Sequence, residues 1–337
     1  MARQLLDEPH SAARIVLSGA TGYLGALTAV TLLQGTAAKI SCLVRSSHDE
    51  NSLLGPIIEE WEAQGQRWSP EVQCRIQRVV LPTDTADTPL LAGALAGADE
   101  VVHCAGHLDY YNIELLEAVN IGFTRHMLEL GKVLGVKRFV YISTAFAAGY
   151  SDGITAEGEL ANPTSDPTHY TRTKREAERV VAASGLPFIV IRPSILIGTA
   201  KTGRYSGKRY GLYQQWMGLE RLTCDRYHPE FHTVAPKLPL NMLHQDAYCE
   251  TFLAVYRWVP SGSHVNQVSR ESTSPSMRHL WDMWFETTRP RVVYYYDRLD
   301  DVPLASIPSR SLSGFHGYPR GVAAETMATT LRQPPSP

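Results

Sequence analysis

Short apolar runs alternate with longer stretches of mixed polarity over the first two thirds of the chain. Six of these runs are rich in Val and Ile and are bounded by turn or helix signals, which predicts buried β-strands. The strands are expected at "ARIVLS" (13–18), "KISCLV" (39–44), "RIQRVVL" (75–81), "EVVHCA" (100–105), "RFVYIS" (138–143) and "PFIVIR" (187–192). Their nearly continuous apolar character is typical of a parallel sheet that is covered on both faces.

The stretches between the strands have helical character. It is clearest at "YLGALTAVTLLQ" (23–34), "IELLEAVNIGFTRHMLELGKVLG" (113–135) and "THYTRTKREAERVVAAS" (168–184). Strands and helices that alternate in this way predict an α/β fold, a doubly wound parallel sheet of the Rossmann type with right-handed crossovers.

The pattern changes after Arg192, where the chain becomes polar and glycine-rich and then aromatic and irregular. We therefore expect two parts and a tail: a Rossmann domain over 1–197 with return segments near 238–257, a smaller substrate-binding lobe mainly over 198–332, and a disordered end at 333–337. Within the lobe, "YGLYQQWMGL" (210–219) predicts an amphipathic helix over a pocket, and "VVYYY" (292–296) fits either an edge strand or a hydrophobic pocket wall.

Composition and charge restrict the class of protein. The chain has 44% hydrophobic and 20% charged residues, which is ordinary for a globular protein, and its net charge of −2 gives no nucleic-acid signature. The five cysteines never form a C-x-x-C pair and the histidines form no ligand motif, so no metal site is expected and a reducing, cytoplasmic location is predicted. We expect neither a signal peptide nor a membrane span.

A glycine-rich turn lies directly after the first predicted strand. In "VLSGATGYLG", Gly19, Gly22 and Gly25 are spaced G-x-x-G-x-x-G between a strand and a helix. Glycines permit the tight turn and let backbone N–H groups and the helix N-terminus approach a diphosphate, whose charge the helix dipole favours. This context predicts a dinucleotide-binding loop rather than an ordinary structural turn.

The ends of the second and third strands bear on the choice of cofactor. An NAD site usually has an acidic residue after the second strand, bonded to the ribose 2′-hydroxyl. Arg45 stands there instead, and its guanidinium suits a 2′-phosphate, so we expect NADP(H) ahead of NAD(H). Asp84, after the third strand, could accept a hydrogen bond from the adenine amine or be a surface-loop residue.

Tyr170 and Lys174 are four residues apart in a predicted helix and therefore share one face of it. A nearby ammonium stabilises a phenolate and so lowers the pKa of a tyrosine from its usual value of about 10. Such a tyrosine can protonate a carbonyl oxygen during reduction. The alternative is a packed ring beside a solvated amine, and the position of the pair between the fifth and sixth strands favours the functional interpretation.

Six motifs occur in the order that is seen in extended short-chain dehydrogenases/reductases: "GATGYLG", "VVHCAG", "VNIGFTRHMLELGK", "RFVYISTAF", "HYTRTKREAE" and "IVIRPSILIG". Within that superfamily, "RPSILIGTAKTG", "STAF" and "LNMLHQD" (240–246) resemble the male-sterility and thioester-reductase branch, which includes fatty acyl reductases. The resemblance is close from residue 13 to 203 and weaker to about 257.

The resemblance implies a role for each matching residue. Thr144 would hydrogen-bond the substrate carbonyl, with Ser143 as its competitor, while Tyr170 would donate the proton and Lys174 would support it and bind ribose. Asn120 matches an asparagine beside the nicotinamide, although a buried residue bonded to helix backbone is an equal alternative. The complete expected cofactor set is Gly19, Thr21, Gly22, Tyr23, Leu24, Gly25, Arg45, Asp84, Ala105, Asn120, Ser143, Tyr170, Lys174, Pro193 and Ile195.

These features predict an NADPH-dependent reductase that transfers hydride to a carbonyl of a hydrophobic substrate, either an aldehyde or an acyl thioester, with a link to a carrier protein or coenzyme A as one option. The main alternative is a ketone/alcohol dehydrogenase of the 3β-hydroxysteroid or dihydroflavonol type. A sugar-nucleotide epimerase ranks lower, because such an enzyme should have an acidic residue in place of Arg45. A non-catalytic NADP-binding protein also ranks lower, because it should lack the Tyr–Lys pair. The resemblance also raises the prospect of a homodimer.

Overall fold

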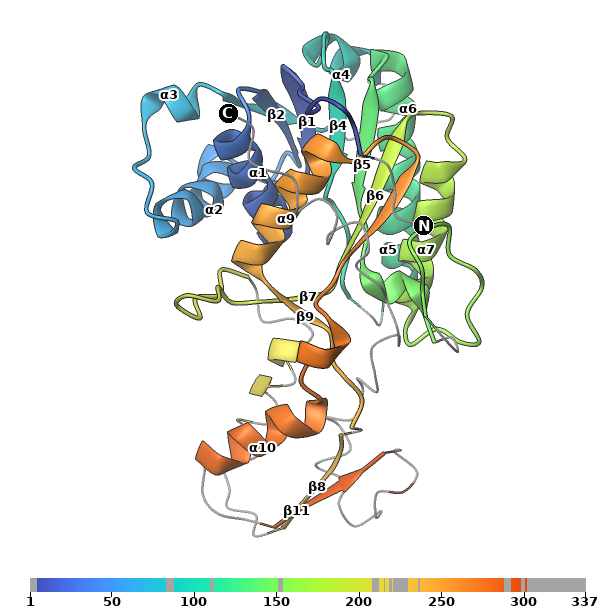
Figure 1. The fold of residues 1–337 in the computed structure, drawn as a ribbon. Helices are drawn as coiled ribbons and strands as arrows, with labels where there is room; N and C mark the ends of the chain where they lie inside the picture. Colours follow the sequence, from blue (N-terminus) through green and yellow to red (C-terminus); the bar gives the residue numbers. More distant parts are fainter. Residues whose placement is uncertain are drawn as a thin grey trace.

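A seven-stranded parallel sheet forms the centre of the upper domain in Figure 1. The computed structural model describes residues 5–82, 88–109, 112–150, 154–207, 212–214, 216–217, 220, 230–235, 237–287, 292–297 and 301. The strand order is β10-β6-β5-β4-β1-β2-β3. The bounds are β1 (Arg14–Ser18), β2 (Lys39–Val44), β3 (Ile76–Val80), β4 (Glu100–His103), β5 (Arg138–Ile142), β6 (Phe188–Pro193) and β10 (Ser263–Gln267). The predicted doubly wound sheet is confirmed, with all six expected strands.

Helices cover both faces of the sheet (Figure 1). One face packs against α1 (Tyr23–Gly35), α2 (Glu50–Ala63) and α9 (Gln245–Trp258), and the other against α4 (Thr88–Ala94), α6 (Thr124–Leu134) and α7 (His169–Ala182). Leu17 belongs to the first core and its neighbour Val16 to the second. Because successive side chains of a strand point to opposite faces, two covered faces require apolar residues at every position.

The long helix expected over 113–135 is divided into three parts. It begins as α5 (Ile113–Leu116), continues as a π-helical segment η2 (Glu117–Phe123) and ends as α6. Gly135 closes α6 in the left-handed conformation, with φ of 65°, as glycine commonly does at helix ends. The π-helical segment contains Asn120, which the sequence had placed in a regular helix, and π-bulges often occur at functional sites.

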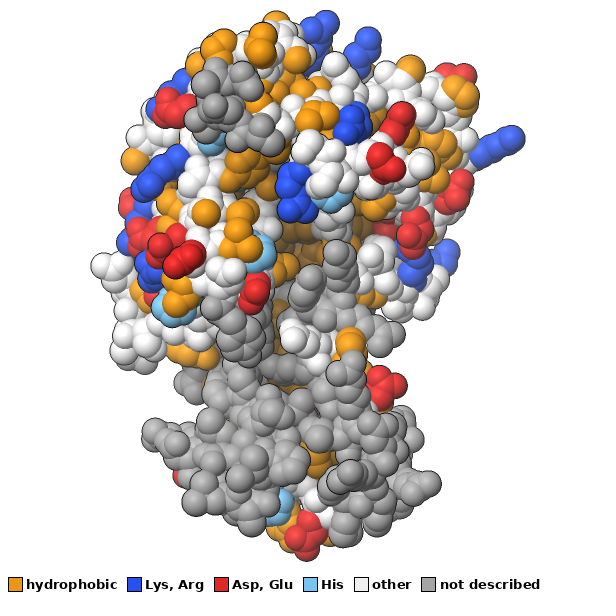
Figure 2. All heavy atoms as spheres, turned by 180° about the vertical axis from the view of Figure 1, so that it is seen from behind, with side chains coloured by type: hydrophobic (Ala, Val, Ile, Leu, Met, Phe, Trp, Pro, Cys, Tyr) orange, Lys and Arg blue, Asp and Glu red, His pale blue; other side chains and the backbone are white. Residues whose placement is uncertain are grey.

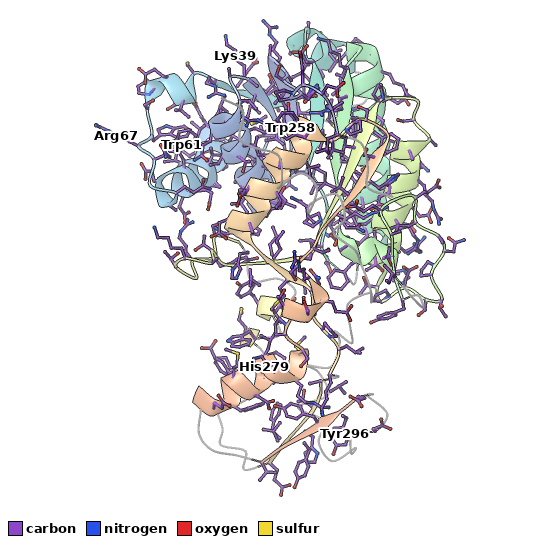
Figure 3. All side chains as sticks on the ribbon, in the orientation of Figure 1. Lys39, Trp61, Arg67, Trp258, His279 and Tyr296 are labelled. Atoms are coloured by element: carbon purple, nitrogen blue, oxygen red, sulfur yellow. The ribbon has the colours of Figure 1, made fainter. Side chains whose placement is uncertain are left out.

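A narrow ribbon joins the sheet domain to the lobe. After β6 the chain forms β7 (Ile195–Ile197), which pairs in parallel with the returning strand β9 (Met242–His244). Beyond this ribbon, β8 (Glu230–Val234) pairs with β11 (Val292–Tyr296) beside α10 (Met277–Thr287), as Figure 1 shows. The edge-strand alternative for 292–296 is thereby confirmed. Figure 3 labels His279 and Tyr296 in the lobe, far from Trp258 at the end of α9.

The lobe has an aromatic core of its own. Phe231, Trp281 and Phe285 are buried there, and Trp216 packs against them from the segment predicted as a lobe helix. Parts of that segment, 210–211, 215 and 218–219, lie outside the described residues, as does the tail 333–337. The chain returns to the sheet domain through α9, which falls in the return segment expected near 238–257. Strand β10 follows that segment and joins the sheet. The domain boundaries stay a prediction.

Short elements complete the described chain: α3 (Pro70–Gln73), η3 (Ala145–Ala148) and η4 (Glu271–Thr273). Figure 2 shows the reverse face, where acidic and basic side chains are interspersed over the sheet domain without a large patch of one sign. Within the described ranges, no helix is both long and apolar enough to cross a membrane. The thiols of Cys42, Cys74, Cys104 and Cys249 are free, and Cys224 lies outside those ranges.

Candidate active site

The predicted site residues gather at the carboxyl edge of the sheet. Because all seven strands are parallel, the segments that follow β1, β2, β4, β5 and β6 leave the sheet at this one edge. The strand order reverses between β1 and β4, and ligands of doubly wound folds bind in the crevice at that point. The topology therefore places the glycine loop after β1 beside the segment that carries Ala105 after β4.

The glycine loop approaches other backbone so closely that side chains would not fit. Gly19 has φ of +82°, and a Cβ there would lie 2.7 Å from the Ala105 nitrogen. A Cβ on Gly25 would lie 2.0 Å from the Gly19 carbonyl oxygen. The Gly22 N–H donates to that same oxygen at 2.9 Å, which closes the turn. The result is a cradle of bare backbone at the N-terminus of α1, which fits the diphosphate of a dinucleotide.

The rest of the loop is held by side chains on α1 and α9. The Tyr23 hydroxyl donates to Gln245 Oε1 at 3.1 Å, and the Leu24 carbonyl accepts from Thr28 Oγ1 at 2.7 Å. Burial, followed by the neighbouring Tyr205, raises the pKa of Tyr23 far above its usual range. Thr21 is half-buried in the turn itself. The contact between Tyr23 and Gln245 thus holds the start of α1 against α9. The cofactor contacts of the loop stay predictions.

Arg45 is exposed directly after β2, where the sequence places it. Its carbonyl accepts from the His48 N–H at 2.9 Å, and the His48 carbonyl accepts from Arg78 Nη2 at 2.6 Å and Nε at 3.0 Å. Arg78, on β3, therefore braces the turn that presents Arg45. Asp84 lies outside the described residues.

Lys174 is buried in α7 and its amine faces β5. Its Nζ donates to the Ile142 carbonyl at 2.8 Å and lies 4.2 Å from the centre of the Tyr141 ring. Burial lowers the pKa of Lys174 to about 7, against the opposing effects of Glu178 and Cys104. An amine with this pKa is charged for part of the time at neutral pH, so small changes nearby control its charge.

Tyr170 is half-buried in the first turn of α7. Burial, then the charges of Glu178 and Tyr170, raise the pKa of Tyr141 well above its usual value. Tyr141 on β5 thus contacts the Lys174 amine and interacts electrostatically with Tyr170. Tyr170 and Lys174 are four residues apart in α7 and so share one face of this helix, as predicted.

The two competing hydroxyls after β5 have different partners. Ser143 Oγ donates to the buried Glu178 carboxylate. Thr144 Oγ1 accepts from the Phe146 N–H at 3.2 Å as the N-cap of η3. Among the described groups, Thr144 Oγ1 has only this acceptor contact, so its own proton can go to a ligand. The Ser143 hydroxyl already donates its proton to Glu178.

Asn120 is buried and joins two segments of the site. Its Oδ1 accepts from the His107 N–H at 2.8 Å, and its Nδ2 donates to Thr173 Oγ1 at 3.0 Å. The Asn120 side chain thereby ties the segment after β4 to α7, one residue before Lys174. Pro193 ends β6 and half-buried Ile195 begins β7, so both lie where the chain leaves the sheet edge.

A buried histidine connects the glycine loop to Asn120. His103 Nδ1 lies 2.6 Å from Ser18 Oγ, and Nε2 lies 3.0 Å from Thr124 Oγ1, which donates its proton to the Asn120 carbonyl. Thr124 can then only accept from His103, so Nε2 carries the ring proton and Nδ1 accepts from Ser18. Burial lowers the pKa of His103 to about 3, which keeps the ring neutral.

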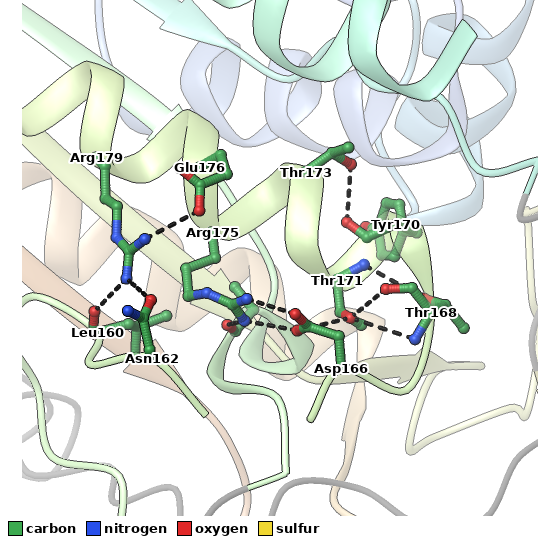
Figure 4. A network of polar contacts seen from close by, with 11 residues as sticks. Leu160, Asn162, Asp166, Thr168, Tyr170, Thr171, Thr173, Arg175, Glu176 and Arg179 are labelled. Atoms are coloured by element: carbon green, nitrogen blue, oxygen red, sulfur yellow. Dashed lines mark hydrogen bonds and ion pairs between the residues drawn. The ribbon is translucent and has the colours of Figure 1, made fainter. Parts of the chain in front are cut away.

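A clasp at the start of α7 is shown in Figure 4. Arg175 binds Asp166 through two nitrogens, at 2.6 and 2.5 Å, and donates to the Ala147 carbonyl at 3.1 Å. Thr168 caps the helix, and Thr171 completes a capping box. Because Ala147 belongs to the turn that Thr144 caps, the clasp fixes Thr144 relative to the helix that carries Tyr170.

The sequence interpretation missed Tyr141, His103, Glu178 and Arg192 as parts of this site. Glu178 carried a signal, because it follows Lys174 by four residues and so shares its helix face. Arg192 ends an apolar strand, where a charged residue needs a buried partner. Among the described residues, no three His, Cys, Asp or Glu side chains form a metal-binding group.

Comparison with known proteins identifies the family. The family model described as male sterility protein matches residues 17–251, more than half of the chain. The chain belongs to the male sterility protein family. Its similarity to curated dehydrogenases and reductases agrees with the resemblance to extended short-chain dehydrogenases/reductases.

Several individual proteins are similar to this male sterility family member. The 3 beta-hydroxysteroid dehydrogenase/Delta 5-->4-isomerase of Mycobacterium tuberculosis is 30% identical over 200 residues, which are 55% of this chain and 47% of that protein. The aureusimine biosynthetic cluster reductase domain covers 97% of this chain and 88% of its own, with TM-score 0.73 and 16% identity. A thiolation-reductase di-domain from an archaeal non-ribosomal peptide synthetase covers 85% and 79%, with TM-score 0.68 and 19% identity.

The curated relatives are longer than this chain. It spans 4%, 51% and 47% of the length of the first three of them. Because these solved structures are only 16% and 19% identical to this family member, they support its fold only. The site geometry described above comes from this chain alone.

Proposed function

We propose that this protein is an NADPH-dependent reductase of a hydrophobic carbonyl compound, with an acyl thioester or the derived aldehyde as substrate. The observation that carries the proposal is the arrangement at the end of β5, where a hydroxyl with an available proton, Thr144, lies beside the helix that presents Tyr170 and buried Lys174. The names of two similar structures, a reductase domain and a thiolation-reductase di-domain, support a thioester held on a carrier.

In this proposal each residue has a defined task. The nicotinamide, when bound, supplies a hydride to the carbonyl carbon. Thr144 donates a hydrogen bond to the carbonyl oxygen as negative charge develops there, and Tyr170 transfers its proton to that oxygen. An aldehyde thereby becomes an alcohol, whereas a thioester becomes a hemithioacetal, whose C–S bond breaks to release the aldehyde and the thiol, the hydroxyl proton passing to sulfur. The Lys174 ammonium stabilises the phenolate that Tyr170 becomes, and solvent returns the proton.

The substrate would enter between the sheet edge and the lobe. Ala145 belongs to the aromatic core of the lobe, and Phe146 and Ile195 pack against that core. These residues lie within two positions of Thr144 or Pro193 in the chain, so apolar residues of the lobe core lie close to the proposed reacting groups. A hydrophobic acyl chain is the substrate portion that these residues favour.

The first experiment measures NADPH oxidation with acyl-coenzyme A thioesters of increasing chain length and with the matching aldehydes. We expect Tyr170→Phe to reduce kcat by roughly 10²- to 10⁴-fold, the usual contribution of a general acid. NADPH binding, followed by nicotinamide fluorescence, should survive the substitution. Turnover in Tyr170→Phe equal to that of the wild type would contradict the mechanism.

Cofactor choice is tested separately at Arg45. Arg45→Ala should weaken NADPH binding about tenfold or more and leave NADH binding nearly unchanged, because a charge-assisted contact to the 2′-phosphate contributes roughly 1.5–3 kcal/mol. Equal losses for the two cofactors would remove the assignment of NADP(H). Arg78→Ala should reproduce part of the effect, since Arg78 braces the same turn.

The sequence similarity to a 3 beta-hydroxysteroid dehydrogenase/isomerase favours a second candidate, a ketone/alcohol dehydrogenase. The same three residues would then act in the direction of oxidation, with Tyr170 as the base. A panel of hydroxysteroids with NAD⁺ or NADP⁺ distinguishes the two candidates. Turnover of steroids without turnover of thioesters or aldehydes would select the dehydrogenase.

A further inference from the structure

A buried carboxylate lies one helical turn beyond Lys174. Glu178 is on the same face of α7, and its side chain is 3% exposed. Residues four apart in a helix have neighbouring side chains. A carboxylate in this position is costly to bury unless other groups compensate its charge.

Two buried groups compensate it, one from each adjacent strand. Ser143, after β5, donates its hydroxyl proton to Glu178 Oε1. Arg192, on β6, donates from Nη2 to Oε2 at 2.7 Å and from Nε to both oxygens at 3.1 Å. Arg192 is itself 1% exposed and is held by the Gly158 carbonyl at 2.7 Å. One carboxylate therefore joins α7, β5 and β6 at the reacting edge of the sheet.

The groups around the Lys174 amine make Glu178 electrostatically distinct. Tyr141 faces the amine from β5, and His103 and Cys104 interact with it from β4 and the segment after it. Burial keeps His103 neutral and raises the pKa of Cys104 to about 12. Among the described groups that interact with the amine, Glu178 is the carboxylate.

We propose that Glu178 is a positioning residue of the active site. It holds the Ser143 hydroxyl away from the substrate, so that Thr144 is the donor to the carbonyl oxygen, and it keeps the buried Lys174 amine charged. The effect of Glu178 on the charge of Lys174 does not depend on the proposed function. Only the role of that charge in the reaction rests on it. The charge of Lys174 itself can be measured without any substrate.

The test follows the Lys174 amine directly. With lysine labelled with ¹³C at Cε, the Cε resonance of each lysine reports protonation of its amine as pH is varied, and Lys174→Arg assigns the signal. Glu178→Gln removes the charge while keeping the size of the side chain. The matched control is Glu176→Gln on the same helix, since Glu176 pairs with partly exposed Arg179.

We expect the Lys174 midpoint to fall by about one pH unit in Glu178→Gln, the size of shift that a nearby opposite charge produces. Glu176→Gln should leave it unchanged. An unchanged midpoint in folded Glu178→Gln would overturn the proposal. If Arg192, left unpaired, prevents folding, Glu178→Gln with Arg192→Met removes both partners of the buried pair. Because this double substitution also removes a positive charge, a smaller fall of the Lys174 midpoint is expected than from Glu178→Gln alone, and a rise would overturn the proposal.

Activity supplies the second readout. Loss of charge on Lys174 ends its support of Tyr170, so the alkaline limb of the kcat/KM profile should move to lower pH together with the Lys174 midpoint. A purely structural role would lower activity equally at every pH and would contradict the proposal. A shifted midpoint in a protein that reduces no thioester, aldehyde or ketone would refute the proposed function and leave the role of Glu178 in the charge of Lys174 standing.

Discussion

At the proposed phosphate end of the crevice the groups that would face a cofactor are backbone atoms, whereas the proposed chemical end is built from side chains. Gly19, Gly22 and Gly25 lie within seven consecutive residues, and the cradle depends on the absence of side chains. The proposed chemical end combines three elements, because Glu178 lies on the same helix as Lys174 and binds Ser143 after β5 and Arg192 on β6. The first end is a local property of the chain, and the second exists only after the sheet has formed.

The largest effect should come from filling the cradle. Gly25→Ala would bring a Cβ to within 2.0 Å of the Gly19 oxygen, so the loop or α1 must move. We expect cofactor affinity to fall more than a hundredfold, with a loss of stability of about 1–3 kcal/mol. Fluorescence titration and denaturant unfolding measure the two effects.

Gly55→Ala is the matched control for that substitution. Gly55 lies within α2, and a Cβ there meets nothing within 4 Å. Replacing an exposed helical glycine by alanine should stabilise the protein by up to about 1 kcal/mol and leave cofactor binding unchanged. Equal behaviour of the two variants would show that the close approach at Gly25 is unimportant.

The next effect separates the two hydroxyls at the chemical end. Thr144→Val should lower kcat by roughly 10²-fold or more, because it removes a donor to the developing oxyanion. Ser143→Ala should cost much less turnover, since its proton goes to Glu178. Single-turnover kinetics with the best thioester or aldehyde measures both variants. A larger loss in Ser143→Ala would reverse the assignment.

A third prediction concerns His103, which links the two ends. Its pKa is about 3 in the folded protein against 6.5 for an ordinary histidine, so between these values the unfolded chain binds more protons. Its contribution to stability is therefore complete above pH 6.5 and falls by about 1.4 kcal/mol per unit as pH is lowered through this window. Urea unfolding at several pH values, compared with His103→Gln, isolates the slope. Parallel curves for the two proteins would disprove it.

The smallest effect on turnover is expected at the clasp. Asp166→Asn keeps the shape of the side chain but removes the charge that faces buried Arg175, so we expect a loss of about 1.5–3 kcal/mol in stability and a several-fold fall in kcat. Glu176→Ala, at a surface pair in Figure 4, should change stability by no more than about 1 kcal/mol. A change in cofactor affinity in Asp166→Asn would place the clasp at the phosphate end instead.

The same contrast explains what could be predicted from the sequence. The apolar strands and the glycine loop are encoded by neighbouring residues, and both are present as expected. Strand β10 was missed because its sequence, "SHVNQ", is mostly polar although every residue is buried. Its polar groups have partners elsewhere, such as Gln267 Nε2 with Thr251 Oγ1 at 2.8 Å. A hydrogen bond between residues far apart in the chain cannot be predicted from the local sequence.

Helix α2 and the chemical network were missed for related reasons. Helix α2 contains Gly55 and Pro56, which interrupt a helical pattern, although its N-cap Asp49 binds the Ser52 N–H at 2.8 Å. Glu178 and Arg192 have the composition of surface residues, and only tertiary contact makes them a buried pair. The π-helical turn around Asn120 follows a sequence that reads as regular helix.

Strand β10 reaches the edge of β6 only after the chain has left the sheet, formed β8 in the lobe and returned through β9 and α9. During synthesis, therefore, the open edge of β6 waits for residues 263–267 to leave the ribosome, and an unpaired edge is exposed to wrong partners until then. The lobe is built from two stretches of chain, one between β7 and β9 that carries β8 and one after β10 that carries α10 and β11. An exchange of lobes between relatives should therefore be cut at β7, at β9 and after β10, and the short ladder from Ile195↔Met242 to Ile197↔His244 holds the first two cuts together.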